Sequence, residues 1–262
     1  MAHSSERLLA LLLPLALLAA CGGARAQTVE RSFEAPERAA PLVQPRAPQT
    51  QVLYLSALRE LPPSGWASWD AIAHALRSFE PDVVLVELPH GTSLRGADPG
   101  AAPFAQAPEV LEVVAPYARQ HGVDVVGVSA RSEEAARDER AYWDDEPHGP
   151  PNRHFVIARA RARAGSLRAS QEGPPDWMYD PAWVHARGAE ARWLSYFAED
   201  HMGEGGVLTV HTRHLGLIED ALADWRGQRV AIVFAAESRW IVEPALRMRA
   251  EVDLVPPRYH LP

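Results

Sequence analysis

The chain has 262 residues, 47% of them hydrophobic, which is enough for one sizeable domain with its own apolar core. Its net charge is −8, all 26 basic residues are arginine, and no basic stripe of the kind that binds nucleic acid is predicted, so nucleic acid is not an expected partner. Cys21 is the only cysteine, so an internal disulfide is excluded and the core must supply the stability.

Residues 1–20 have the organisation of a bacterial signal peptide. A short polar start containing Arg7 leads into the apolar stretch 8–20, which is too short to cross a bilayer as a helix, for which about 20 residues are needed. The tetrad Leu18-Ala19-Ala20-Cys21 resembles the lipobox that the lipoprotein signal peptidase reads. Cleavage ahead of Cys21 would leave this cysteine as the lipid anchor that holds the protein to a membrane.

A second cleavage pattern is present a few residues later. Ala24-Arg25-Ala26 fits ordinary signal cleavage, which would release a soluble protein. We favour the lipoprotein because the apolar stretch ends directly at the only cysteine. Gly22 follows Cys21 where aspartate would signal inner-membrane retention in some Gram-negative bacteria, so the resemblance implies the cell envelope, at the periplasmic face of the outer membrane.

The remainder of the chain divides into a tether and one folded domain. Residues 21–50 are rich in Ala, Pro, Arg and Gln without periodicity, which is typical of a flexible tether. From residue 51 the pattern becomes regular, and we predict a domain over 51–262. Its first half shows strand, helix, strand, helix and strand at 52–55, 66–79, 82–88, 107–120 and 123–128.

The second half of the domain begins with a polar, mostly helical insertion at about 131–205. A helix, a strand, a helix and a short strand follow at 207–225, 229–234, 240–250 and 252–255. The predicted fold class is therefore α/β: a central, mainly parallel sheet flanked by helices, with a helical insertion before the last strands and right-handed crossovers.

Candidate functional residues follow the predicted strands, since ligands of parallel α/β sheets gather beyond the carboxyl ends of the strands. Three strand ends carry polar groups: Ser56 to Arg59, Glu87 with His90, and Glu237 with Ser238. Glu87 closes an apolar run, where an unpaired carboxylate would be costly. It is either a functional group or a structural one held by a salt bridge or a capped loop.

Two further patterns have a functional and a structural interpretation. His211 and His214 are spaced to share one helix face and could bind a metal, but the glutamate of His-Glu-x-x-His is missing and a solvated helix face is the alternative. The aromatic residues of 177–179 either floor a pocket or pack in the core.

The order of these parts resembles the TraB/TIKI/ChaN superfamily across roughly residues 50–260. In that superfamily a first strand ends in Gly-x-x-His, a second ends in glutamate, a later helix carries an arginine, and a last strand ends in a second Gly-x-x-His. Residues 52–59, 81–87, 213–215 and 230–238 occupy these four places, and Glu87 and Arg213 match the family's glutamate and arginine.

Both signature histidines are replaced. Ser56 and Arg59 stand where the first glycine and histidine would be, and Ala235-Ala236-Glu237-Ser238 replaces the second motif. Guanidinium stays protonated and has no lone pair to offer a cation, whereas imidazole is the usual neutral nitrogen ligand. We therefore expect a degenerate member that has lost the inherited metal site, with no metal and no cofactor bound.

The first functional hypothesis is an envelope lipoprotein that binds a small-molecule or protein ligand without catalysis. The ChaN branch is associated with haem, so the resemblance implies haem or an iron-uptake role as one alternative. Arg59, Glu87, Arg213 and Glu237 are expected to converge at the mouth of the sheet, and His90 and His214 are further candidate ligand-binding residues.

The second hypothesis is a metal-dependent hydrolase with a remodelled site. Glu87 would act as general base, Arg213 would stabilise an oxyanion, and a divalent metal would bind through His211, His214 or His90. The third hypothesis is a purely structural envelope lipoprotein.

Overall fold

The computed structural model describes residues 48–58, 68–90, 92, 94, 107–144 and 150–262, all of which belong to one compact unit, Arg46–Pro262. The predicted signal peptide, Cys21, nearly all of the predicted tether and Arg59 lie outside the described residues.

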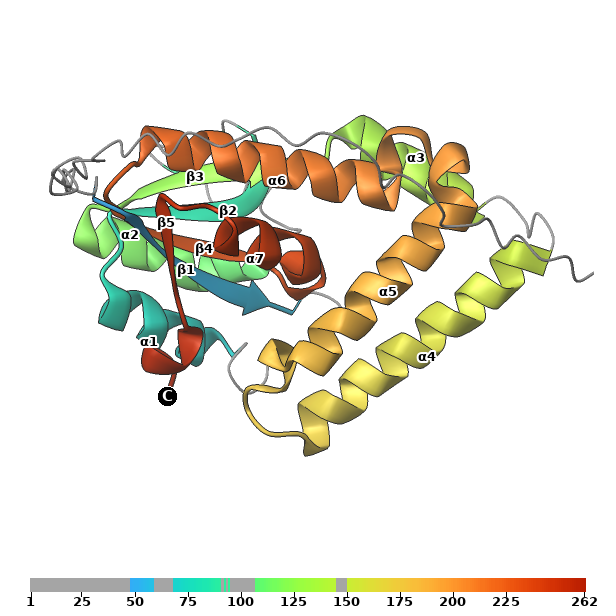
Figure 1. Cartoon of the computed structure of the whole chain (residues 1–262), viewed down its shortest axis with the longest axis horizontal. Helices are drawn as coiled ribbons and strands as arrows, with labels where there is room; N and C mark the ends of the chain where they lie inside the picture. The colour runs from blue at the N-terminus through green and yellow to red at the C-terminus, as the bar shows by residue number, and fades with distance from the viewer. Residues whose placement is uncertain (1–47, 59–67, 91, 93, 95–106, 145–149) are drawn as a thin grey trace, which may run out of the picture. The chain divides into compact units, whose positions relative to one another are not determined.

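A single five-stranded sheet forms the centre of this unit (Figure 1). Its strands are β1 (Thr50–Ala57), β2 (Val83–Pro89), β3 (Asp124–Ser129), β4 (Arg229–Ala235) and β5 (Val252–Val255). They lie in the order β3-β2-β4-β1-β5, and each neighbouring pair is parallel. The predicted α/β class is confirmed, and the sheet is more uniform than the expected mainly parallel one.

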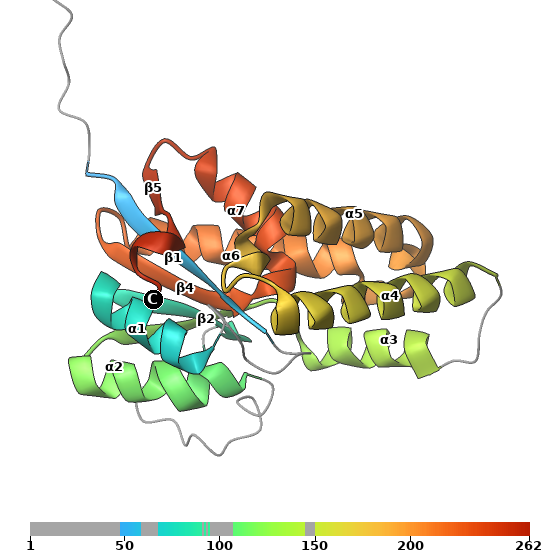
Figure 2. The ribbon, with the colours of Figure 1, turned by 90° about the horizontal axis from the view of Figure 1, so that it is seen from below.

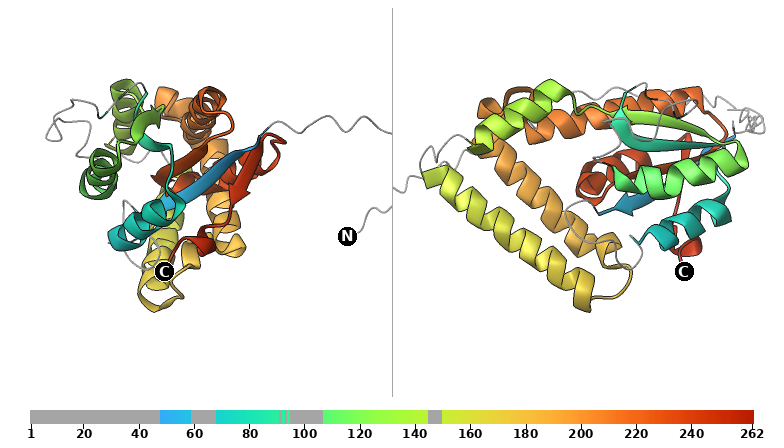
Figure 3. Two further views of the ribbon diagram at one scale, coloured as in Figure 1. Left: turned by 90° about the vertical axis from the view of Figure 1, so that its left-hand side faces the viewer. Right: turned by 180° about the vertical axis from the view of Figure 1, so that it is seen from behind.

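Helices cover both faces of the sheet (Figure 3). The side chains of β1 alternate: Leu53 and Leu55 pack in the cluster formed with α1 (Trp69–Phe79) and α2 (Ala115–His121). Val52 and Tyr54 instead join the cluster formed with α6 (Val207–Asp224) and α7 (Arg239–Arg247). Both faces are apolar, which is why the strands read as unbroken hydrophobic runs.

Two of these helices depart from the expected pattern. A π-helical turn, η3 (Val110–Val114), leads into α2, so the helix predicted over 107–120 is not regular α-helix throughout. The first helix begins at Trp69 rather than at 66, because the Ser68 hydroxyl caps it by accepting the N–H of Ala71.

The predicted insertion consists of α3 (Glu133–Asp144), α4 (Pro150–Glu172), η4 (Trp177–Tyr179), α5 (Pro181–Ala198), η5 (Glu199–His201) and η6 (Gly203–Gly205). Figures 1 and 2 show α3, α4 and α5 beyond the arrowhead of β1, at the carboxyl end of the sheet. The helical insertion therefore lies over the edge where ligands of such sheets gather.

Two close contacts fix the insertion to the rest of the domain. In η4, Trp177 and Met178 are buried with Leu58 and Ala236, just beyond the ends of β1 and β4. On α5, Gly188 lies so close to Trp240 that an added Cβ would stand 3.2 Å from its ring and Cβ atoms. The aromatic residues of 177–179 are thus packing residues rather than an open pocket floor.

Within the part of the chain that the structure describes, no helix combines the length and the apolar character needed to span a bilayer.

Candidate functional site

Glu87 is the buried carboxylate at the end of β2. The alternation of the strand directs it to the same face as Val83 and Leu85, towards α6 and α7. Its Oε2 accepts the backbone N–H of Ala235 at 3.1 Å. The carbonyl of the same Ala235 accepts the Tyr54 hydroxyl at 3.2 Å, so one residue at the end of β4 links a side chain of β1 to the end of β2.

A buried arginine that the sequence had not singled out lies beside these groups. Arg239, at the start of α7, is only 3% exposed. Its Nε stands 2.5 Å from Oε2 of Glu243 one turn later, and its NH1 donates to the Ser56 hydroxyl at 3.3 Å. A full positive charge is thereby neutralised inside the protein.

Two tyrosine rings cover this guanidinium. Its central carbon lies 4.3 Å from the ring centre of Tyr179 and 5.2 Å from that of Tyr54, within the range of cation–π attraction. The Tyr179 hydroxyl also accepts the backbone N–H of Ser56 at 3.1 Å. Burial raises the pKa of both tyrosines, against the opposing charge of Arg239, so both hydroxyls stay protonated at neutral pH. We call Tyr54, Ser56, Tyr179, Arg239 and Glu243 the arginine cluster.

A second group, the histidine cluster, comprises His211, His214, Ser129 and Ser238. His211 Nδ1 lies 3.2 Å from the Ser238 hydroxyl, and His214 Nε2 lies 3.3 Å from the Ser129 hydroxyl. The two rings are 6.1 Å apart on one face of α6. The expected sharing of a face is confirmed. His214 is buried against Phe234 of β4 and His211 is half-buried against Trp240 of α7, so this is not the solvated face offered as the alternative.

The electrostatics of the histidine cluster favour a neutral His211 ring. Burial, then the neighbouring His214, lower the pKa of His211 to about 4, although the charge of Glu87 opposes the shift. A neutral imidazole keeps one lone pair and one N–H, so it can accept and donate hydrogen bonds or act as a base. The charge of Glu87 contributes to the pKa shifts of both His211 and Tyr54, so this carboxylate lies near both clusters.

Arg213, expected to face Glu87, lies on the outer side of α6. Its side chain is half exposed and forms an ion pair with Glu204. Its neighbours His211 and His214 turn inward, and Arg213 is about 200° around the helix from His211. Once the two histidines are placed on the buried face, the helical period directs the arginine outward.

The remaining predicted residues are scattered. His90 is exposed, and its backbone N–H donates to the Ser129 carbonyl at 3.2 Å. Glu237 is half-buried and affects the pKa of Tyr54, so it lies near the arginine cluster. Arg59 is outside the described residues. Of the six expected residues, the structure brings Glu87, His214 and Glu237 to the region of the two clusters.

The sequence analysis did not identify Arg239 or Tyr179 as site residues, and only one of the two has a local sequence signal. Arg239 directly follows Glu237-Ser238, a strand end already identified, and so was within reach. Tyr179 comes from the insertion, 123 residues after its partner Ser56, and no local pattern connects them.

No three His, Cys, Asp or Glu side chains of the described residues come together in a group that could hold a metal ion. The described polar groups at this edge can therefore be credited with hydrogen bonding, charge pairing and proton transfer.

Comparison with known proteins adds no relative. The resemblance to the TraB/TIKI/ChaN superfamily stays a prediction from the order of motifs. No protein-family model, curated protein or solved structure matches this chain.

Proposed function

We propose that this chain is a lipid-anchored protein of the cell envelope whose α/β domain binds a ligand without catalysis. The binding region is the carboxyl edge of the sheet, where the histidine cluster meets Glu87. The observation that carries the proposal is the inward-facing, neutral His211 beside Ser238 and Glu87. Such a set of acceptors and donors suits a polar group of a ligand, and a neutral imidazole also suits the iron of haem.

The arginine cluster supports a binding role over a catalytic one. The charge of Arg239 is used within the protein by Glu243, Ser56 and two aromatic rings. An arginine held in this way fixes the end of the sheet to α7 and leaves less charge for a developing oxyanion.

Lipid anchoring is tested on Cys21. The wild-type protein should take up a fatty-acid probe and fractionate with membranes, and Cys21→Ser should do neither. A Cys21→Ser protein that is still labelled and still membrane-bound would overturn the anchor.

Ligand binding is tested on the purified Cys21→Ser protein with haemin and with Zn²⁺ and Mn²⁺. A ligand that binds only the folded state must raise the unfolding temperature. We expect haemin to raise it for the parent protein and not for His211→Ala, while His185→Ala, an exposed position on α5, responds like the parent. An equal haemin response in the His211→Ala variant contradicts the site.

A hydrolase is the second candidate, and one contact favours it. The Ser238 hydroxyl and His211 Nδ1 stand 3.2 Å apart, within the reach of a nucleophile and its general base. A fluorophosphonate probe should then label Ser238, and His211→Gln should suppress the labelling. One tightly held metal per chain would instead favour the metal-dependent form with Glu87 as base.

A further inference from the structure

The outward face of α5 has an unusual composition. Its exposed positions recur at intervals of three and four residues, so they share one face of the helix. Among these described positions there is no carboxylate, and Arg192 carries the only permanent charge. The face consists of Ala182, His185, Ala186, Ala189, Arg192, Trp193, Tyr196 and Phe197.

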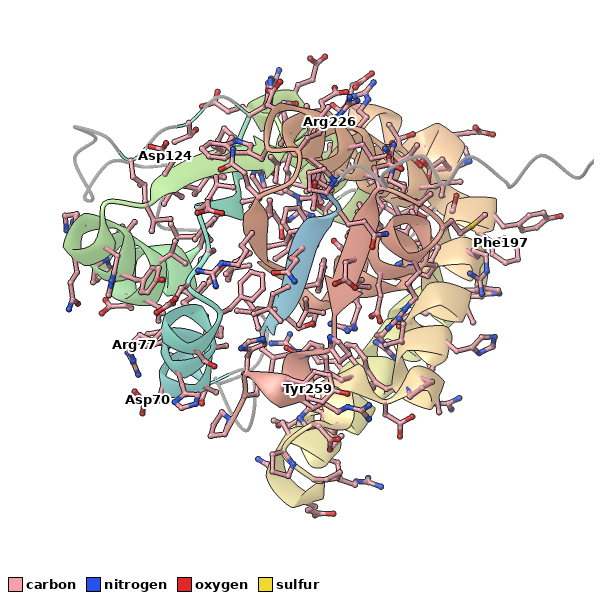
Figure 4. All side chains as sticks on the ribbon, turned by 60° about the vertical axis from the view of Figure 1, so that its left-hand side comes forward. Asp70, Arg77, Asp124, Phe197, Arg226 and Tyr259 are labelled. Carbon is pink, nitrogen blue, oxygen red and sulfur yellow. The ribbon has the colours of Figure 1, made fainter. Side chains whose placement is uncertain are left out.

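Three aromatic residues occupy the carboxyl-terminal end of this face. Trp193, Tyr196 and Phe197 are 36%, 83% and 39% exposed. The ring of Phe197 contacts both others, with centroids 5.1 Å from Trp193 and 4.9 Å from Tyr196. Figure 4 shows Phe197 standing clear of the ribbon. Touching aromatics in water mark an interaction surface rather than scattered surface hydrophobes.

The neighbouring helix α4 contributes positive charge. Its sequence holds five arginines and one glutamate in a chain whose net charge is −8. Among its described side chains, Arg161, Arg163 and Arg168 are exposed, as are the apolar Ile157 and Leu167.

Helices α4 and α5 run side by side in opposite directions (Figures 1 and 2). The Trp183 indole N–H donates to the Ser166 hydroxyl at 3.3 Å, which fixes their register. Trp193 and Ile157 each lie about two and a half to three turns from this contact, in the same direction. The aromatic end of α5 is therefore level with Ile157 of α4, and Arg161 lies between that level and the Trp183–Ser166 contact.

The antiparallel pair α4 and α5, which we call the hairpin, carries exposed arginines, and this charge indicates the kind of partner that it can bind. A second copy docking through the same face would bring arginine against arginine, because a twofold contact pairs a surface with itself. An anionic surface meets the arginines favourably, and tryptophan and tyrosine favour the interface between lipid headgroups and acyl chains. Twenty-eight residues lie between Cys21 and Thr50, a span of up to about 100 Å when extended, so an anchored domain can turn this face to the bilayer.

We propose that the hairpin of α4 and α5 docks on an anionic lipid bilayer, with Trp193, Tyr196 and Phe197 among the headgroups and Arg161 and Arg168 of α4 on the phosphates. The proposal rests on the membrane location suggested above, but its test does not need the lipid on Cys21. A failed vesicle experiment and a failed fatty-acid labelling experiment are therefore separate results.

The experiment uses the Cys21→Ser chain and flotation with vesicles of phosphatidylcholine, with or without 30% phosphatidylglycerol. We expect binding to the anionic vesicles that weakens with salt. Arg161 and Arg168 are seven residues apart and so share one face of α4. Arg161→Gln with Arg168→Gln should weaken binding about 30-fold, since each arginine near such a surface contributes about 1 kcal/mol. Tyr196→Ser with Phe197→Ser should weaken it at least tenfold.

Matched controls lie elsewhere on the surface, at Arg226 and Tyr259 (Figure 4). Tyr259 is 64% exposed and Arg226 is exposed, so Arg226→Gln and Tyr259→Ser should bind like the parent chain. Unchanged unfolding temperatures exclude misfolding as a cause. Equal binding to neutral vesicles, or equal losses in the controls, overturns the proposal. So does a dimer, seen by sedimentation, that Tyr196→Ser with Phe197→Ser disrupts.

Discussion

At the scale of single residues, the interior of this domain holds charge where its sheet meets α7. Glu243 bridges two arginines in very different surroundings: the Arg239 side chain is 4% exposed, whereas that of Arg247 is 57% exposed. The same carboxylate thus makes one buried and one surface ion pair, and the two pairs should contribute very differently to stability.

Glu243→Gln should lower the free energy of unfolding by about 3 kcal/mol, because it leaves the buried Arg239 without its carboxylate. Arg247→Gln should change it by less than about 1 kcal/mol. Combining Glu243→Gln with Arg239→Met removes the stranded charge and should recover part of the loss. Urea unfolding of the four proteins measures this, and equal effects of Glu243→Gln and Arg247→Gln would contradict a buried pair.

His211 gives the domain a dependence on pH with a definite sign. Its pKa falls from 6.5 when unfolded to about 4 when folded, so the unfolded chain takes up the proton first as the pH drops. The stabilisation is complete above pH 6.5 and is lost progressively between pH 6.5 and 4, to a limit of about 3 kcal/mol.

His211→Gln should flatten the stability profile over that range, while His185→Gln on the exposed face of α5 keeps it. Urea unfolding at several pH values gives the slope, and an NMR titration follows the ring directly. A ring that titrates near 6.5 in the folded protein would remove the basis of this prediction.

At the scale of elements, the sequence indicated most of the regular structure. Runs such as Val83–Leu88 and Val230–Phe234 are buried on both faces, so their apolar character alone identifies them as strands. The placement of β4 between β1 and β2 has no local signal, since it depends on contacts between residues more than a hundred positions apart. The same distinction holds for the candidate site. Glu87 could be predicted from its place at a strand end, whereas the contact of Tyr179 with Arg239 forms only when the insertion folds onto the sheet.

Two glycines, Gly205 in η6 and Gly216 in α6, differ in how much space surrounds their Cα atoms. An added Cβ at Gly205 would stand 2.4 Å from the Ala135 carbonyl oxygen and 2.8 Å from the Glu139 nitrogen, both backbone atoms of α3. At Gly216, within α6, a Cβ would meet nothing within 4 Å.

Gly205→Ala should therefore push α3 away from η6 and destabilise the domain by about 1–3 kcal/mol. Gly216→Ala should stabilise it by about 0.5–1 kcal/mol, because alanine loses less backbone entropy in a helix. Thermal unfolding of both variants supplies the comparison. A stabilising Gly205→Ala would mean that α3 does not pack on this turn.

At the scale of the whole molecule, the sequence from residue 21 to about residue 50 has no periodicity, and the domain begins directly after it. The first strand of the domain pairs with two neighbouring strands of the sheet. Thr50 is 2% exposed, its N–H donates to the Glu251 carbonyl and its hydroxyl accepts the N–H of Gly227. From Thr50 onward β1 pairs with β5, and from Gln51 with β4. Stability should therefore depend sharply on where the amino-terminal segment is cut.

In the Cys21→Ser protein, deletion of residues 22–47 should leave the unfolding temperature within about one or two degrees of the parent, because a segment without an apolar face buries little. Deletion of residues 22–53 should lower it by ten degrees or more, on the order of 3–5 kcal/mol, since it removes the buried Thr50, Val52 and Leu53 from between β4 and β5. The two deletions differ by only six residues, so chain length and purification history are matched. A large effect of the shorter deletion would show that the segment packs on the domain and that the tether is wrong. A negligible effect of the longer one would show that β1 is dispensable, which its position between β4 and β5 argues against.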